Sequence, residues 1–218
     1  MNENNALGYN PDQVKQVFQE LENWNNEIQA ARCTEFQDKV IVPLSERWFA
    51  PEAIKFVEFY IDRTKSYMSE QIACYHVYNE IINEAAQKWA ESVGEVYVPY
   101  PDNELYLVDK LDSTIMKNSD NGFRGIKGGI SELAVVMKAL QQRITNASLS
   151  LKSVASQSAA FMGAAQMENL NRDIDTSIRW NNEDFENFAL AFENGMKETE
   201  GKYTQTAQAN AQRFSGGN

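Results

Sequence analysis

The sequence predicts an all-α protein: an elongated four-helix bundle made of two antiparallel helical hairpins, with a connector that is irregular or forms a β-hairpin. Two observations support this fold. Apolar residues recur at three- and four-residue steps over four long stretches of the 218-residue chain, which is typical of amphipathic helices. An aromatic residue marks the break within each pair of stretches, at Trp48 and at Phe161. Helices of this length need partners for their apolar stripes, and a bundle supplies them.

The first helix is expected to begin at Asn10 and Pro11, because an asparagine cap followed by proline suits a helix start. Its stripe predicts about 35 residues of helix, with Pro43 bending or closing the end before Trp48. The stripe consists of Val14, Val17, Phe18, Leu21, Trp24, Ile28, Ala31, Phe36 and Val40.

Pro51 provides the start signal for the second helix, and Glu52 lies where the helix dipole favours negative charge. The same apolar period then continues as far as Gly94. Because the turn between these two helices is short, they should fold back antiparallel as a first hairpin over residues 1–94. The second stripe consists of Ile54, Val57, Ile61, Met68, Ile72, Tyr75, Ile82, Ala86, Trp89 and Val93.

Residues 95–129 differ in character and are expected to connect the two hairpins. Prolines and β-favouring residues predict an extended segment, with a small β-hairpin around Pro101 to Asn103 as one form of it. Breaks follow at 119–122 and at 125–129, which are rich in glycine.

The second hairpin is expected over residues 130–218. Its first helix should begin around Ser131 and end near Phe161, and its second should run from about Ala164 towards Arg213. Asn181, Asn182 and Gly195 are weak interior points at which the last helix could kink. The two stripes consist of Leu133, Val136, Met137, Leu140, Ile144, Leu151 and Val154, and of Met167, Leu170, Ile174, Ile178, Phe185, Phe188, Phe192, Met196 and Tyr203.

The charge balance limits the classes of partner. Lysine and arginine total 20 against 31 aspartate and glutamate, and both halves of the chain are acidic. An acidic surface disfavours nucleic acid and anionic membranes as partners. The longest aliphatic run is about 133–137, and the first residues lack a basic and an apolar region. We therefore expect neither a transmembrane span nor a cleavable signal peptide.

No set of residues predicts catalysis, a metal or a cofactor. Cys33 and Cys74 lie 16 and 25 residues from the turn near Phe49, which separates them by roughly 13 Å along a hairpin, too far for a disulfide. We expect both to be core thiols. His76 is the single histidine and lacks a Glu-x-x-His motif, so it is expected to be structural or exposed.

The tetrapeptide Trp-Asn-Asn-Glu occurs twice, at 24–27 and at 180–183. The offset between these copies is 156 residues, whereas the aromatic turns are 113 apart. Because the two repeats disagree in register, we interpret the tetrapeptide as a coincidence, and acidic positions on the helices as solvated outer faces.

The segment from Leu44 to Phe56 resembles the turn of the WXG100 proteins, small secreted substrates and partners of type VII (ESX) secretion systems. Their hallmark is a helical hairpin of about a hundred residues with Trp-x-Gly in the turn. Trp48 matches the tryptophan, Phe49 the variable residue, and Ala50 stands in the glycine position. The resemblance covers residues 11–94.

A more distant resemblance covers residues 130–213, where Phe161 replaces the tryptophan, Met162 follows it and Gly163 keeps the glycine. Family hairpins pair through their apolar faces as dimers. The resemblance thus implies a fused dimer on one chain: a monomer with an internal pseudo-dimer, with a homodimer left open. It also implies recognition by a secretion ATPase or by other WXG100-like or effector helices.

The chain departs from the family at two points. Ala50 before Pro51 gives up the conformational freedom of glycine, so the turn should differ in shape. The family's export signal is Tyr-x-x-x-Asp/Glu on the helical tail, but Tyr203 is followed four residues later by Ala207. Tyr100 and Glu104 satisfy the spacing in the connector, where the neighbouring prolines disfavour a helix.

Two interpretations of Trp48 stay open at the sequence level. In the first, Trp48 closes its own hairpin by packing on Leu44 or Phe56. In the second, it also forms part of a recognition notch between the turn of one hairpin and the helix ends of the other. Phe161 is expected to be mainly structural.

The resemblance implies a non-enzymatic, virulence-associated protein that is cytoplasmic before export and leaves the cell by the type VII route. The alternative is a stand-alone structural or toxin-like bundle that acts on membranes. The lack of a continuous apolar hairpin of spanning length weakens this alternative.

Overall fold

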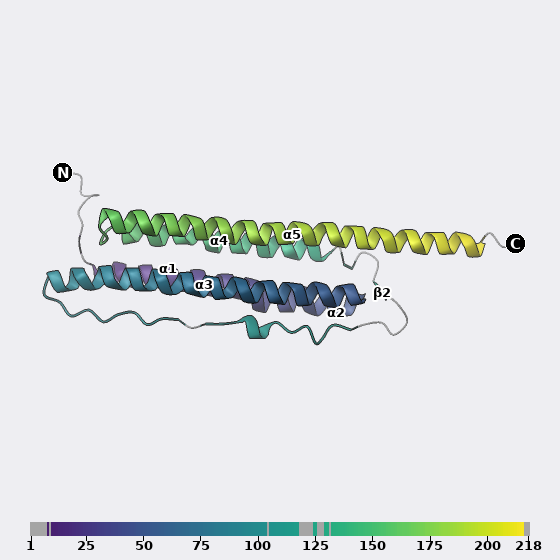
Figure 1. Cartoon of the computed structure of the whole chain (residues 1–218), viewed down its shortest axis with the longest axis horizontal. Helices are drawn as coiled ribbons and strands as arrows, with labels where there is room; N and C mark the ends of the chain where they lie inside the picture. Colours follow the sequence, from purple (N-terminus) through teal and green to yellow (C-terminus); the bar gives the residue numbers. More distant parts are fainter. Residues whose placement is uncertain are drawn as a thin grey trace.

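The computed structural model describes residues 8, 10–103, 105–117, 124–125, 129–130 and 132–215. It confirms the all-α class: two long helical hairpins lie along each other in an elongated four-helix bundle (Figure 1). The buried apolar residues of both hairpins form one hydrophobic core.

The first long helical segment is continuous from Pro11 to Arg47 but not purely α-helical. It comprises α1 (Pro11–Gln29), the π-helical turns η2 (Ala30–Thr34) and η3 (Gln37–Ile41), and α2 (Val42–Arg47). The Asn10 side chain accepts hydrogen bonds from the Asp12 and Gln13 amides, which confirms the predicted cap. The π turns were not predicted. The second lies directly before Pro43, whose ring would meet the carbonyl of residue 39 in a regular α-helix.

α3 (Pro51–Ser92) is the return helix of the first hairpin. It begins at the predicted proline and ends two residues before Gly94, whose φ of 76° lies in the left-handed region. The Glu95 amide donates to the Ala90 carbonyl at 2.9 Å and closes the helix end. Val93, which follows the helix, is 56% exposed, so the apolar stripe ends before it.

The connector is irregular along most of its described length. The described residues of 95–117, a segment that we call the strap, run along the first hairpin and include the 3₁₀ turn η4 (Val108–Lys110) (Figure 1). Of the two predicted forms of the connector, the irregular one is present: the described residues Pro101 to Asn103 form no strand. Instead β2 (Arg124–Gly125) pairs antiparallel with β1 (Trp48–Phe49) in the turn of the first hairpin.

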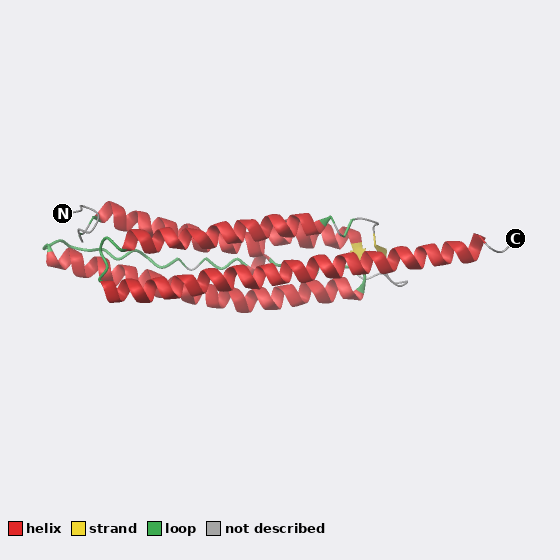
Figure 2. Ribbon diagram, turned by 90° about the horizontal axis from the view of Figure 1, so that it is seen from above, coloured by secondary structure: helices red, strands yellow, loops and turns green. Residues whose placement is uncertain are grey.

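The second hairpin consists of α4 (Leu133–Ser158) and α5 (Ala164–Ser215). The predicted start at Ser131 lies outside the described residues. α5 runs without a break in helical structure through Asn181, Asn182 and Gly195. Its C-terminal part extends beyond the end of the other helices (Figure 2).

The core is rich in aromatic contacts between the hairpins. Phe36 stacks on Tyr60 with ring centroids 3.5 Å apart, and Phe188 of α5 lies 4.9 Å from Tyr60. Phe56 of α3 lies 4.9 Å from Phe192 of α5. These contacts join the first long helical segment, α3 and α5, so the hairpins are held together by shared packing.

Candidate recognition site

The Trp48 turn is buried, and three elements meet there: α2, β1 and α5. Trp48 has extended backbone and ends α2, and its indole is only 4% exposed. The indole Nε1 donates a hydrogen bond to the hydroxyl of Tyr203 on α5, at 3.1 Å. The turn of the first hairpin therefore contacts the last helix of the second.

Alanine fits the glycine position of this turn because the backbone there is extended. Ala50 has φ −156° and ψ 152°, a conformation open to any residue, and it is fully buried. Its carbonyl accepts the Ala53 amide at 3.0 Å, in the first turn of α3, which starts at Pro51. The turn does not need the left-handed freedom of glycine. Phe49, between these residues, is half-buried and belongs to β1.

Polar contacts tie the second hairpin to the same end of the bundle. Arg47 donates to the Gly129 carbonyl at 3.0 Å and pairs with Glu132 at 3.3 Å. Glu200 of α5 accepts the Ile130 amide at 3.0 Å. The start of α4, the Trp48 turn and the C-terminal third of α5 thus meet at one place, just before α5 leaves the bundle.

The second predicted turn lies at the opposite end of the molecule (Figure 1). Phe161 and Met162 are 1% and 2% exposed, and both their amides donate to the Ser158 carbonyl. Gly163 is exposed, and a Cβ there would meet only the Gln166 side chain, at 3.9 Å. Close approach of another backbone does not require glycine at this position.

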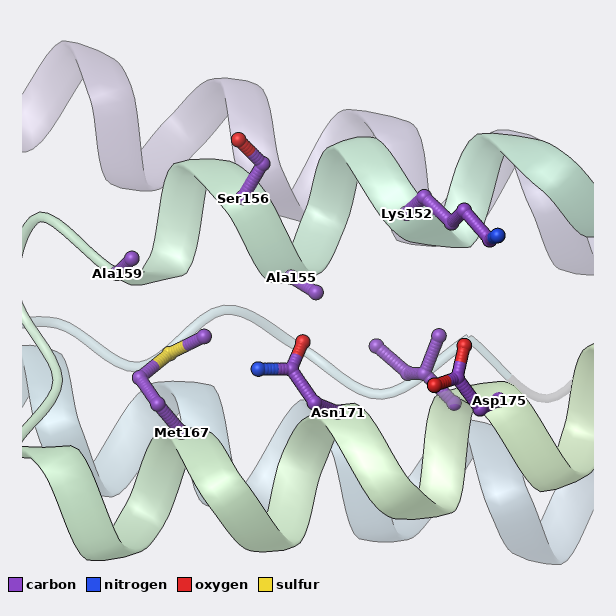
Figure 3. Close-up of a pocket in the computed structure, with 8 residues that line it drawn as sticks. Lys152, Ala155, Ser156, Ala159, Met167, Asn171 and Asp175 are labelled. Atoms are coloured by element: carbon purple, nitrogen blue, oxygen red, sulfur yellow. The ribbon is translucent and has the colours of Figure 1, made fainter.

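A groove of about 350 Å³ lies between α4 and α5 near the Phe161 turn (Figure 3). Ala155 of α4 and Ala159, which directly follows α4, face Met167 and Asn171 of α5 across it (Figure 3). Its charged members, Lys152 and Asp175, are exposed, so the groove holds no desolvated charge to fix a ligand.

Tyr100, the described member of the Tyr100 and Glu104 pair, is separated from the Trp48 turn. Tyr100 is half-buried on the strap and stacks on Phe18 of α1, with ring centroids 4.3 Å apart. Its described neighbours, residues 95–103, are not helical, as the prolines predict. Glu104 lies outside the described residues.

The two cysteines are free thiols in different surroundings. Burial raises the pKa of Cys33 to about 12, against a smaller opposing effect of the Arg32 charge, so this thiol is protonated at neutral pH. Burial also raises the pKa of Cys74, which is half-buried rather than part of the deep core. Neither thiol has the lowered pKa of a nucleophile.

The described residues contain no cluster of histidine, cysteine, aspartate and glutamate that could hold a metal ion. His76 instead contacts Asp102 of the strap at 2.5 Å. None of the helices in the described ranges combines the length and apolarity needed to cross a membrane.

Sequence reasoning missed a buried polar seam between the hairpins. Arg32 of η2 is 2% exposed and binds Asp184 of α5 at 3.1 Å and the Asn181 carbonyl at 3.2 Å. Its guanidinium lies 3.4 Å from the ring centroid of Tyr67. The sequence predicts a solvated outer face for the acidic positions of the helices, but the side chain of Asp184 is only 10% exposed. The sequence did carry a signal of this buried ion pair: Arg32 is a charged residue inside the apolar stripe of the first helix, four residues before Phe36.

The repeated tetrapeptide contributes to this interior. Asn25 and Asn181, the matching asparagines of the two copies, are both fully buried. Asn181 donates to the Ser177 carbonyl at 2.9 Å, and Asn25 accepts from Gln29 at 3.3 Å.

Comparisons of the chain with protein-family models, with curated proteins and with solved structures gave no match.

Proposed function

We propose that this protein is a non-enzymatic substrate or helical partner of a type VII secretion system, built as a fused pair of WXG100-like hairpins. One observation carries the proposal: the Trp48 turn of one hairpin contacts α5 of the other hairpin through Tyr203. In this proposal the chain is cytoplasmic before export and leaves the cell without a cleavable signal peptide.

The mechanism is recognition without chemistry. Because the Trp48 indole is buried, a partner does not contact it directly. Trp48 instead fixes α5 at Tyr203, and the exposed residues 205–209 continue the helix beyond this contact. A secretion ATPase, or a helix of another WXG100-like or effector protein, binds this end of the bundle.

The fused arrangement leads us to propose a monomer in which the second hairpin takes the place of a dimer partner. Each hairpin already covers the apolar face of the other in one core. The net charge of −11 disfavours nucleic acid as a partner. If sedimentation shows an elongated monomer, this arrangement is supported. If it shows a dimer formed by exchange of hairpins, the proposed monomer is wrong.

Export assays of Trp48→Ala and Trp24→Ala test the proposal. Trp24 is a matched control because it is also a buried tryptophan, 1% exposed, that lies in the same core but away from the turn. Each substitution should cost about 3–5 kcal/mol of stability. Export from cells with an active type VII ATPase should fall at least tenfold further for Trp48→Ala than for Trp24→Ala, with helicity followed by circular dichroism.

Cells that lack the ATPase provide the baseline. Equal export of the two variants would contradict the proposed role of the Trp48 turn in recognition. Export of the unchanged chain from cells without the ATPase would remove the type VII route itself.

A further inference from the structure

The strap is held along the first hairpin by side-chain amides that bind its backbone. Asn83 of α3 accepts the Tyr100 amide at 2.9 Å and donates to the Tyr100 carbonyl at 3.2 Å. Gln37 of η3 does the same for Asp112, at 2.9 Å and 3.4 Å. Each side chain therefore binds both backbone groups of one strap residue.

A third amide lies between these two. Gln29 of α1 is fully buried, accepts the Leu107 amide at 2.9 Å and donates to the Leu105 carbonyl. A carboxamide carries an acceptor and a donor side by side, as a peptide group does. The three amides therefore bind the strap as a neighbouring β-strand would, without reading its side chains.

Apolar anchors supply the selectivity that backbone contacts lack. The ring of Tyr100 stacks on Phe18, and the side chains of Val108, Leu111 and Met116 are 1%, 8% and 7% exposed. Other strap residues point outward: Val96 and Val98 are 92% and 76% exposed. This combination of backbone pairing with spaced anchors is the usual chemistry of extended-peptide binding.

We propose that the groove between the α1 side and α3 of the first hairpin is a binding site for extended polypeptide, and that the strap is its displaceable resident. The partner it fits is an extended segment with an aromatic residue followed by aliphatic residues spaced as at 108, 111 and 116. The strap runs along the outer side of the first hairpin, opposite α4 and α5 (Figure 1). Its release therefore leaves the contact between the hairpins in place.

A labelled peptide with the sequence of residues 96–117 tests this site on the full-length chain. In the unchanged protein the tethered strap competes at an effective concentration on the order of millimolar. The variant Tyr100→Ala/Leu111→Ala weakens the strap and leaves the groove intact. It should bind the peptide at least about tenfold more tightly than the unchanged chain, by fluorescence anisotropy.

Two further measurements separate groove binding from loose association. A peptide N-methylated at both Leu107 and Asp112 lacks the two amide hydrogens that bind the side-chain oxygens of Gln29 and Gln37. It should bind at least about tenfold more weakly than the unmodified peptide. A peptide N-methylated at the exposed Val98 is the matched control and should bind as the unmodified peptide does. This pair alters only the peptide, so a folding defect cannot account for the result.

Equal binding of the differently methylated peptides would overturn the proposal. So would a weakened-strap variant that keeps its helicity but binds the peptide no better than the unchanged chain. Neither measurement involves export, so the outcome is independent of the proposed secretion function.

Discussion

Replacing Asp184 by asparagine tests the ion pair that joins the two hairpins inside the bundle. The Asp184 carboxylate binds Arg32 at 3.1 Å, and the two side chains are only 10% and 3% exposed. The same carboxylate also binds Arg63, whose side chain is 50% exposed. The substitution keeps the shape of the side chain and removes its charge, so Arg32 remains buried without a counterion.

The size of the effect follows from what remains around Arg32. Breaking a buried pair by removing one partner costs about 3–5 kcal/mol. The Asn181 carbonyl, at 3.2 Å, and the Tyr67 ring still stabilise the guanidinium, so the lower value of about 3 kcal/mol applies. For a chain of this size each kcal/mol shifts Tm by about 2–4 °C, which gives a fall of about 6–12 °C.

Urea and thermal unfolding followed by circular dichroism measure this loss. Arg63→Ala removes the exposed partner of the same carboxylate and should cost less than about 1 kcal/mol. The double variant Arg32→Met/Asp184→Leu removes both buried charges and should recover most of the loss. An Asp184→Asn variant within about 0.5 kcal/mol of the unchanged chain would refute the reasoning, as would an equal loss in Arg63→Ala.

Two other predictions follow from the thiols and from the Trp48 contact. Iodoacetamide at pH 8 should label Cys74 slowly and leave Cys33 unlabelled until urea is added, because burial raises both pKa values, that of Cys33 to about 12. The rate at which iodoacetamide labels Cys74, measured by mass spectrometry, should still increase above pH 9. A labelling rate that reaches a plateau below pH 9 would contradict the raised pKa. Tyr203→Phe removes the acceptor of the Trp48 indole and should cost about 1–2 kcal/mol in urea unfolding, since the buried donor is left unpaired. A variant as stable as the unchanged chain would show that the indole does not depend on this hydroxyl.

The ends of the first hairpin could be predicted from sequence because they depend on local chemistry. The Asn10 cap, the proline start at Pro51 and the left-handed Gly94 each act within one turn of helix. The path of the strap could not be predicted, because Gln29 and Asn83, which bind its backbone, come from two different helices. Until those helices pack, prolines and β-favouring residues suit a hairpin equally well.

The polar seam shows a different limit. The long side chain of an arginine within an apolar stripe ordinarily lets its guanidinium group reach water. An aspartate near a helix surface is ordinarily exposed. Arg32 and Asp184 are buried only because each lies opposite the other across the interface of the hairpins. Which residues lie opposite depends on the register of four helices, and the stripes alone leave that register open.

The length of the connector decides which turn meets which helix. α3 has 42 residues and is about 63 Å long, and the strap, at about 3.3 Å for each residue of 95–117, reaches about 76 Å. The strap therefore carries the chain back along the full first hairpin, so that α4 starts beside the Trp48 turn. A connector of a few residues would start α4 at the far end and place Tyr203 away from Trp48. The contact between Trp48 and Tyr203 thus depends on the length of the connector as well as on the two residues that form it, whether or not the strap is bound to the first hairpin.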